Sequence, residues 1–300
     1  MGYIDSVEEF REFARGVIYP RERTLFGELP EGAFVRLVPE DIDVGGGRMK
    51  LHEIDRLRDF PDARILVVSG LNQEGFEYLI RTYGQQFRIL QFFKNKLVED
   101  WSLLSTLPDL EYVYYFFNQR IDRFWDMSEN KKLKGLSILD FSRLKSLRGI
   151  ERAENLEYFR LGNAVWDKAV VDSYRYFANT NVRYLSFWGK KILDTDPSYL
   201  PSMKKLEQFD GIMYGCTKEQ FAWVKANAAN CLDIGPYVMT DTDPKTKEVQ
   251  EWAVFPWKGK RSYILKGKEQ RFAGELAEFN ALVERYRGVP YEAIFRETPP

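Results

Sequence analysis

The residues that could carry acid–base or nucleophilic chemistry are few in this chain of 300 residues. There is one histidine, His52, and there are two cysteines, Cys216 and Cys231. A Ser–His–Asp or Cys–His site would have to use His52, which lies in the repetitive segment LHEIDRL. One histidine is too few for a multi-histidine zinc site, and the two cysteines have no metal-ligand spacing. We therefore predict no catalytic residues and no bound metal.

Two short segments resemble fragments of ligand-binding loops. Gly45-Gly46-Gly47 lacks the G-x-x-x-x-G-K-[ST] context of a phosphate loop, and we interpret it as a flexible turn. Asp241 and Asp243 have the opening spacing of a calcium loop, but the remaining ligands of an EF-hand are missing. Neither segment predicts a bound ion, and we expect no cofactor.

A third segment, WKGKRSYILKGK, mixes basic and aromatic side chains. Such a mixture can bind phosphates and stack on bases. The formal net charge of the chain is −1 at pH 7, however, and this balance favours a solvated hairpin with polar turns. Nucleic-acid binding here is therefore the weaker interpretation. The residues concerned are Trp257, Lys258, Lys260, Arg261, Tyr263, Lys266 and Lys268.

The start of the chain and its hydropathy predict a cellular location. The segment MGYIDSVEEFREF has neither the basic nor the apolar region of a secretory signal, and no run approaches the about 18 apolar residues of a membrane-spanning helix. Gly2 and Ser6 fit the pattern for N-myristoylation, but Ser6 with Glu9 is better interpreted as a capping box. We expect a cytoplasmic protein with reduced thiols and no membrane partner.

The elements that must position any site follow an internal repeat. The frame L-x-x-L-x-L recurs between about residues 51 and 215, with steps of 24, 23, 23, 23, 26 and 24 residues. Apolar residues three apart precede the frame, as in Leu104, Leu107 and Leu110, which fits a short 3₁₀ or helical return. Stacked units of this kind bury one continuous core, and their strands pair in parallel. The frames begin at Ala63, Phe87, Leu110, Leu133, Leu156, Val182 and Leu206.

The segment NKLVEDWSLLSTLPDLEYVYYFFNQRI resembles the short bacterial repeat of the leucine-rich repeat family, of the internalin type. The resemblance implies an α/β solenoid, a leucine-rich repeat horseshoe of about seven parallel strands. The sequence departs from the family at the turn after the strand. Asparagine is present there at Asn95 and Asn118, but Phe141, Ala164 and Lys190 replace it in later units. We therefore expect the family's continuous asparagine ladder to be interrupted.

Both ends of an open solenoid need covering, because they expose apolar faces and strand edges. Residues 1–50 are predicted to form an N-terminal cap, with a helix over residues 6–17 and the alternating segment FVRLV. Residues 51–215 form the leucine-rich repeats in this prediction.

Residues 216–300 are predicted to form a C-terminal α+β module. Thr217 and Gln220 make a capping box for a first helix. The runs PYVMT, EWAVFPW and RSYIL, separated by turn residues, predict strands. The closing segment KEQRFAGELAEFNALVERYRG predicts a helix that ends at Gly288. Its apolar face consists of Phe272, Leu276, Phe279, Leu282 and Tyr286.

The candidate site comes from the aromatic run LEYVYYFFNQR. If Leu110, Val113 and Tyr115 face the core, the alternating side chains face the concave surface of the sheet. The same register through the repeats predicts two aromatic patches there. Exposed aromatic and arginine side chains are typical of binding hot spots. The predicted partner-binding residues are Phe93, Tyr112, Tyr114, Phe116, Tyr158, Arg160, Tyr184 and Trp188.

The sequence therefore favours a protein–protein interaction module: a bacterial-type cytoplasmic scaffold, adaptor or inhibitor of the immunity type that binds a protein on its concave face. The competing interpretation of the aromatic run is that neighbouring rings cover one another, or that the C-terminal module covers them. The alternative function is an enzyme that recognises its substrate with the repeats and performs chemistry in residues 216–300.

Overall fold

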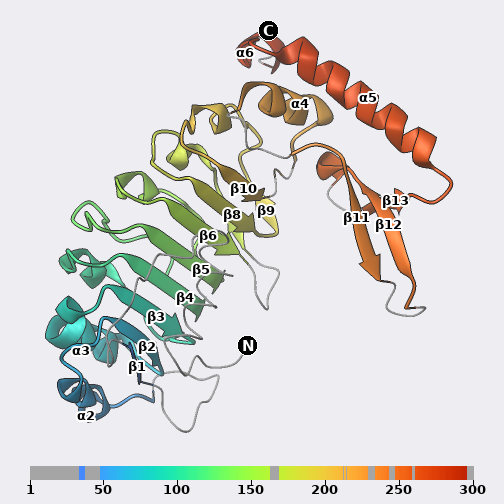
Figure 1. Ribbon diagram of the computed structural model, residues 1–300. Coiled ribbons are helices and arrows are strands. Elements are labelled where there is room, and N and C mark those ends of the chain that lie inside the picture. The colour runs from blue at the N-terminus through green and yellow to red at the C-terminus, as the bar shows by residue number, and fades with distance from the viewer. Residues whose placement is uncertain are drawn as a thin grey trace.

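The computed structural model describes residues 34–37, 48–162, 169–211, 213, 215–228, 234–242, 247–258 and 261–295. Within these residues, parallel strands stack into one curved eight-stranded sheet (Figure 1). Their order in space follows the order of the chain, as expected for a solenoid. The strands are Phe34–Leu37 (β1), Ile65–Ser69 (β2), Ile89–Phe93 (β3), Tyr112–Asn118 (β4), Gly135–Phe141 (β5), Tyr158–Gly162 (β6), Tyr184–Trp188 (β8) and Gln208–Gly211 (β10).

The predicted solenoid is confirmed, and each of its seven strands lies on one predicted frame. One further strand, β1, extends the sheet, and it falls within the segment that was assigned to the N-terminal cap. A small parallel pair, Val170–Val171 (β7) and Lys191–Ile192 (β9), joins two of the later repeats. The large sheet is therefore longer by one strand than the repeat pattern indicated.

The return segments run along the convex side and are mostly short (Figure 1). Only one of them is a longer helix, Gln73–Tyr83 (α3), which begins where the Asn72 side chain accepts a hydrogen bond from the Gly75 N–H at 2.8 Å. The other described returns contain a helix of four residues, Leu51–Ile54 (α2), or 3₁₀ turns, except the return between β4 and β5, which contains neither. The 3₁₀ turns are Asp55–Asp59, Gly84–Gln86, Ser102–Thr106, Ile150–Arg152, Arg175–Phe177 and Leu200–Ser202.

The core takes the residues that the repeat frame predicted. Leu90 and Phe92 of β3, and Val113 and Tyr115 of β4, are fully buried in one continuous hydrophobic cluster. The apolar residues of the returns, such as Leu104, close the cluster from the convex side. One repeat could not bury these side chains by itself, so stability comes from stacking.

A left-handed residue ends each of the first four repeat strands. Gly70, Lys94, Phe117 and Asp140 have φ values of 81°, 56°, 68° and 56°, and they occupy the same position of consecutive repeats. The left-handed region costs a residue with a Cβ about 1–2 kcal/mol, so three of these four turns are strained. Phe117 is thus the turn residue of its repeat.

Two asparagines follow these left-handed residues and hold the turns together. The Asn95 side chain accepts a hydrogen bond from the Leu71 N–H at 2.8 Å and donates one to the Val68 carbonyl at 2.9 Å. Asn118 donates to the carbonyls of Asn95 and Val98, at 3.0 and 2.9 Å. Each asparagine therefore links its turn to the previous repeat, and satisfies buried backbone groups that water cannot reach.

The predicted interruption of this ladder is confirmed at Phe141. Its ring is buried in the core and packs edge-on against Tyr115, with ring centroids 5.0 Å apart. Because the hydroxyl of Tyr115 is buried, it needs a hydrogen-bond partner, and it donates to the Asn95 carbonyl at 2.7 Å. Aromatic packing thus replaces the amide ladder after the second asparagine.

A second buried asparagine site was not predicted from the sequence. Asn130 lies in the return between β4 and β5, accepts the Trp125 indole N–H at 2.8 Å, and donates to the carbonyls of Leu104 and Leu107. The bonds cross from one repeat to the previous one. Asn130 occurs once and outside the repeat frame, so no periodic signal marks it.

From β3 to β10, charged residues alternate in sign at the position just before each strand of the large sheet, whereas Arg64 before β2 has the same sign as Arg88. This charge ladder consists of Arg88, Glu111, Lys134, Glu157, Arg183 and Glu207, and each of these residues donates its backbone N–H to the carbonyl of the repeat before it. Arg88 contacts Glu111 at 2.5 Å, and Arg183 contacts Glu157 at 3.3 Å and Glu207 at 2.7 Å. A shift of one repeat would bring like charges together, so the ladder favours the observed stacking.

The C-terminal part contains the helices and strands that the sequence predicted. Helix Lys218–Asn227 (α4) begins with the predicted capping box, in which Gln220 N–H donates to the Thr217 hydroxyl at 3.2 Å. The three strands form an antiparallel sheet. On the predicted apolar face of the last long helix, the side chains of Phe279 and Tyr286 are buried. The remaining elements are Tyr237–Thr242 (β11), Val249–Val254 (β12), the 3₁₀ turn Pro256–Lys258, Arg261–Ile264 (β13), Glu269–Tyr286 (α5) and Glu292–Phe295 (α6).

The core continues across residue 215. Phe221 and Val224 of α4 and Phe279 of α5 belong to the same hydrophobic cluster as Leu200 and Met203 of the last return. Helix α4 lies on the end of the solenoid, and α5 lies on α4 (Figure 1). The division of the chain at residues 50 and 215 stays a prediction.

Several predicted features lie outside the described residues. They are the helix over residues 6–17 with Ser6 and Glu9, the Gly2 pattern, the triple glycine at 45–47, and Ala164, Cys231, Asp243 and Lys260.

Two glycines test the role of backbone conformation. We expect Gly70→Ala to lower the free energy of unfolding by about 1–2 kcal/mol, because alanine is strained at a φ of 81°. The matched change Gly274→Ala, inside helix α5 with open space around its Cα, should raise it by about 0.5–1 kcal/mol. Urea titrations of both variants measure the effects, and changes of the same sign would contradict the assignment.

The charge ladder makes a separate prediction about Arg183, which is partly exposed and lies between two carboxylates. Arg183→Gln should cost about 0.5–1 kcal/mol of unfolding free energy, and Arg183→Glu more, because it adds like-charge repulsion. Salt at 1 M shortens the Debye length to about 3 Å and should bring the two variants closer together. Equal stabilities of the two variants at low salt would show that the alternation of charge has no effect.

Candidate functional site

The concave face of the sheet has the predicted register. Neighbouring strands align Tyr112 with Ile89 and Gly135, and Tyr114 with Gln91 and Ser137. The alignment continues through the sheet, so the alternating side chains that were predicted to face the concave surface lie side by side on adjacent strands. Tyr158 lies beside Tyr184, Arg160 beside Ser186, and Phe93 beside Phe116.

Most of the predicted aromatic residues are buried. Tyr112 and Tyr114 are each 1% exposed, and Phe93, Phe116 and Tyr158 are 5% exposed or less. The sequence analysis expected these rings to be exposed, and this expectation is wrong for all five. Cross-strand pairs account for part of the burial: Phe93 and Phe116 have ring centroids 5.2 Å apart.

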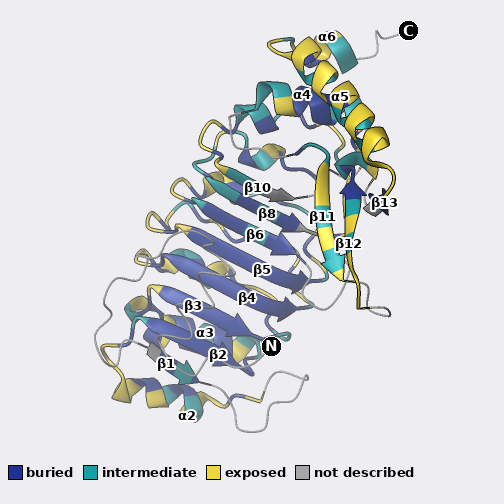
Figure 2. Ribbon diagram, turned by 45° about the vertical axis from the view of Figure 1, so that its right-hand side comes forward, coloured by how far each residue is buried: buried dark blue, intermediate teal, exposed yellow. Residues whose placement is uncertain are grey.

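The burial explains the composition of the aromatic run. Strands β2 to β5 are buried at every position, on the concave side as well as on the core side (Figure 2). A parallel strand that is covered on both faces carries a nearly continuous apolar sequence rather than an alternating one. The run from Tyr112 to Phe117 is therefore what the position of β4 requires, and the assumption of one solvated face was wrong there.

The accessible part of the concave face lies toward the C-terminal end of the sheet. Arg160 of β6, Tyr184 and Ser186 of β8, and Gln208 of β10 are all partly exposed. The rings of Tyr158 and Tyr184 stack with centroids 4.8 Å apart and planes 3° apart. Of Trp188, the described structure includes the backbone in β8 but not the side chain.

Hydrogen bonds and charge fix the accessible ring of Tyr184. Its hydroxyl donates to Glu207 at 2.9 Å, and the Arg183 guanidinium lies 5.4 Å from the ring centroid. Hydrogen bonding to Glu207 raises the pKa of Arg183. The site therefore presents a rigid aromatic ring beside a charge pair of the ladder.

Buried polar groups lie on the closed part of the concave face, on β3 to β5. Gln91 Oε1 and Ser137 Oγ are buried on the concave face, and no described atom forms a hydrogen bond with either. Tyr114 lies between them on β4, and burial raises the pKa of Tyr112 and of Tyr114 well above the usual range for a tyrosine. Buried polar atoms without partners are uncommon in native proteins, so these two distinguish this face from the core face.

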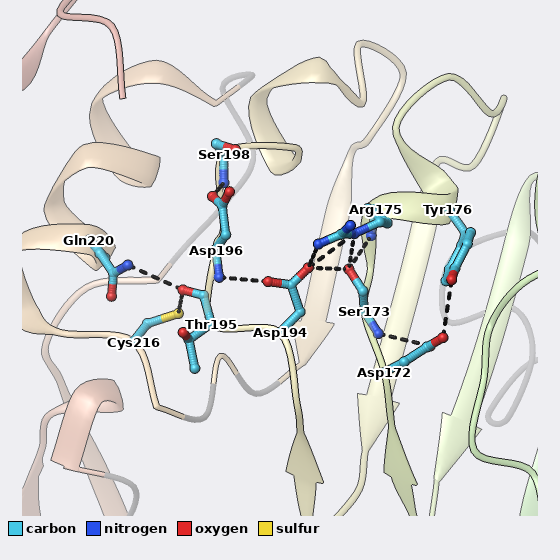
Figure 3. A network of polar contacts seen from close by, with 10 residues as sticks. All are labelled: Asp172, Ser173, Arg175, Tyr176, Asp194, Thr195, Asp196, Ser198, Cys216 and Gln220. Carbon is cyan, nitrogen blue, oxygen red and sulfur yellow. Dashed lines mark hydrogen bonds and ion pairs between the residues drawn. The ribbon is translucent and has the colours of Figure 1, made fainter. Parts of the chain in front are cut away.

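A polar network joins the last repeats to the C-terminal helices (Figure 3). The Asp194 carboxylate accepts hydrogen bonds from Ser173 Oγ and Arg175 Nη2, both at 2.6 Å, and from the Asp196 N–H at 2.9 Å. Burial raises the pKa of Asp194, but the hydrogen bonds outweigh burial and leave the pKa below its usual value. The network is an ion pair with satisfied partners, which is a structural arrangement rather than a catalytic one.

The residues considered for chemistry are not brought together. His52 is exposed on α2, at the opposite end of the solenoid from Cys216. Burial raises the pKa of the Cys216 thiol to about 12, so it stays protonated at neutral pH, and its sulfur contacts the Thr195 carbonyl at 3.4 Å. The thiolate is the nucleophile, so a thiol of this pKa is inert. Among the described residues, no group of three or more His, Cys, Asp or Glu side chains could hold a metal ion.

The basic and aromatic segment after residue 256 uses its rings for packing. Trp257 stacks on Phe279 with centroids 5.2 Å apart, and Tyr263 is buried against Phe255. Lys258 lies 4.5 Å from the centroid of the Phe255 ring and 3.9 Å from Glu275. These two rings therefore offer no free face on which bases could stack.

Within the part of the chain that the structure describes, no helix is long and apolar enough to cross a membrane.

Comparison with known proteins gives similarity of fold only. No protein-family model and no curated protein matches the chain. Among solved structures, it is similar to internalin C2 of Listeria monocytogenes, with a TM-score of 0.41 and 19% identity over 52% of this chain and 64% of that one. An internalin (InlF) of the same organism has a TM-score of 0.39 and 11% identity, over 52% of this chain and 44% of that one.

A third structure, a complex of TLR13 with ssRNA13, gives a TM-score of 0.33 and 14% identity, over 59% of this chain and 33% of that one. The chain thus spans less than two thirds of the length of each of these proteins. The strand order, the register and the step of about 23 residues define a solenoid of parallel strands, which is the fold that the resemblance of the sequence to leucine-rich repeats implied. The similar solved structures include two internalins.

The Asp194 network predicts a dependence of stability on pH. A pKa below the usual value of about 3.9 means that this carboxylate stabilises the fold above pH 4, and that the contribution is lost as the pH falls through the folded-state pKa. We expect Asp194→Asn to be less stable at pH 7, and to lose less stability between pH 5 and pH 3 than the wild type.

Thermal unfolding at several pH values measures this difference. Asp196→Asn is the matched control, because the Asp196 carboxylate accepts the Ser198 N–H in the same turn. The assignment fails if Asp194→Asn and the wild type lose the same stability on acidification.

Proposed function

We propose that this chain is a protein-interaction module that binds a folded protein partner over the concave side of its repeats. From the predicted set, the contacts would be made by Arg160 and Tyr184, with Trp188 kept from the sequence-based prediction. The buried rings of Phe93, Tyr112, Tyr114, Phe116 and Tyr158 would support them from within the sheet. A role as a scaffold, adaptor or inhibitor in the cytoplasm stays part of this proposal.

The observation that carries the proposal is the gradient of burial along the concave face. The face is closed over β2 to β5 and opens at β6 and β8, where Arg160 and Tyr184 are partly exposed beside the stacked Tyr158 ring. Tyrosine and arginine with packed surroundings are the residue types that dominate binding energies. We infer that a partner makes its first contact here.

The experiment compares partner capture by two double variants. We expect Arg160→Ala/Tyr184→Ala to lose its main partner in affinity purification with mass spectrometry, because it removes the accessible hot spot. Phe60→Ala/Arg123→Ala is the matched control, since it deletes an exposed ring and an exposed guanidinium from the return segments.

Circular dichroism must first show that both variants are folded. The candidate partner is then titrated against the purified chain, where the loss should be at least about tenfold in Kd, or about 1.4 kcal/mol. Equal binding by the concave variant and the control would refute the concave site.

A further inference from the structure

The small C-terminal sheet has a free edge at β11. The strand order is β11–β12–β13, and among the described residues β11 pairs only with β12. The Leu265 N–H donates to the Glu251 carbonyl at 2.8 Å, so the backbone groups of Glu251 point to β13. Those of Gln250 and Trp252 point to β11, because the direction alternates along a strand.

The same alternation assigns the backbone groups of β11. Asp241 and Met239 lie opposite Gln250 and Trp252, and they bond inward. The N–H and carbonyl groups of Val238 and Thr240, and the carbonyl of Thr242, therefore point outward from the edge, whereas the Thr242 N–H donates to the Asp241 carboxylate at 2.8 Å. These three residues are exposed in the described structure (Figure 2).

This edge has few of the features that protect strand edges in natural proteins. Its sequence, YVMTDT, contains no proline, no lysine and no bulge; Asp241 is its one charged residue, and Pro236 comes directly before it. The sheet also exposes large apolar residues. Tyr237 and Val238 are 47% and 40% exposed, and Val249 and Ile264 are 70% and 39% exposed. An open edge with exposed apolar residues is a site for strand addition.

We propose that two copies of this chain pair β11 with β11, antiparallel about a two-fold axis at Met239, and form a continuous six-stranded sheet. The strand is complementary to itself in this register. Val238 lies opposite Thr240 of the second copy, so that outward backbone groups meet. Tyr237 lies opposite Asp241, where a phenol can donate to a carboxylate, and no like charges face each other.

The side chains of the sheet support the same axis. Met239 lies opposite Trp252, and Trp252 lies opposite Ile264, which gives one apolar row across the three strands. The two-fold axis would join this row to its copy through the two Met239 side chains. The six-stranded sheet would then have one continuous apolar row of six side chains, three from each copy.

Sedimentation and light scattering over a range of concentrations test the dimer. We expect a reversible dimer for the wild type, and dissociation at least about tenfold easier for Thr240→Pro, because proline removes an outward N–H without removing a bond to β12. Thr240→Val keeps the N–H and should remain dimeric. Thermal unfolding checks that both variants are folded.

A cysteine variant tests the register independently of the proline variant. In a Cys231→Ser background, Met239→Cys should form a disulfide-linked dimer on mild oxidation, because residues on the axis are close enough to bridge. Val249→Cys is the matched control, exposed on the same sheet but away from the axis.

A monomer at all concentrations overturns the proposal, as does a dimer that shows neither the Thr240→Pro effect nor the Met239→Cys bridge. Binding of β11 to a strand of another protein by a monomeric chain also overturns it.

Discussion

The structure depends on the in-register pairing of backbone groups between consecutive repeats. A repeat of about 23 residues holds one short strand and one return, which is too little to bury its own apolar side chains. Parallel pairing places Val113 between Leu90 and Leu136, so that each unit covers the next. The core is continuous for that reason, and it runs on into α4 and α5.

Polar and charged residues fix the register that the apolar residues alone would leave open. A sheet of repeated leucines could slip by one unit with little loss of packing. Asn95 and Asn118 each bond to the previous repeat, and the alternating charges before the strands match only in the observed order. The ion pairs are mostly exposed, and each contributes little stability. Their effect is to select among alternative stackings, which requires only small differences in energy.

The repeat frame made most of the fold predictable from the sequence. Its period gave the strands, the core residues and the concave columns, because a period of 23 residues is visible without knowledge of contacts. The burial of the concave face was not predictable in this way. Alternation along one strand predicts the face on which Tyr112 and Tyr114 lie, and it does not report whether that face is covered. The continuous apolar run of β4 did contain the signal, since strands covered on both faces have this composition.

The aromatic side chains of the concave face lie in the predicted register, but their burial changes which of them a partner could contact. A fully exposed aromatic face would bind a partner at little cost in reorganisation. On this face, the rings of β3 and β4 are already packed, so most of their hydrophobic gain is made within the chain and is not available to a partner. Under the proposed function, binding energy would come from the partly exposed side chains of Tyr184 and Arg160. The specificity of the proposed site would then rest on a phenol and a guanidinium, beside aromatic rings that are already packed.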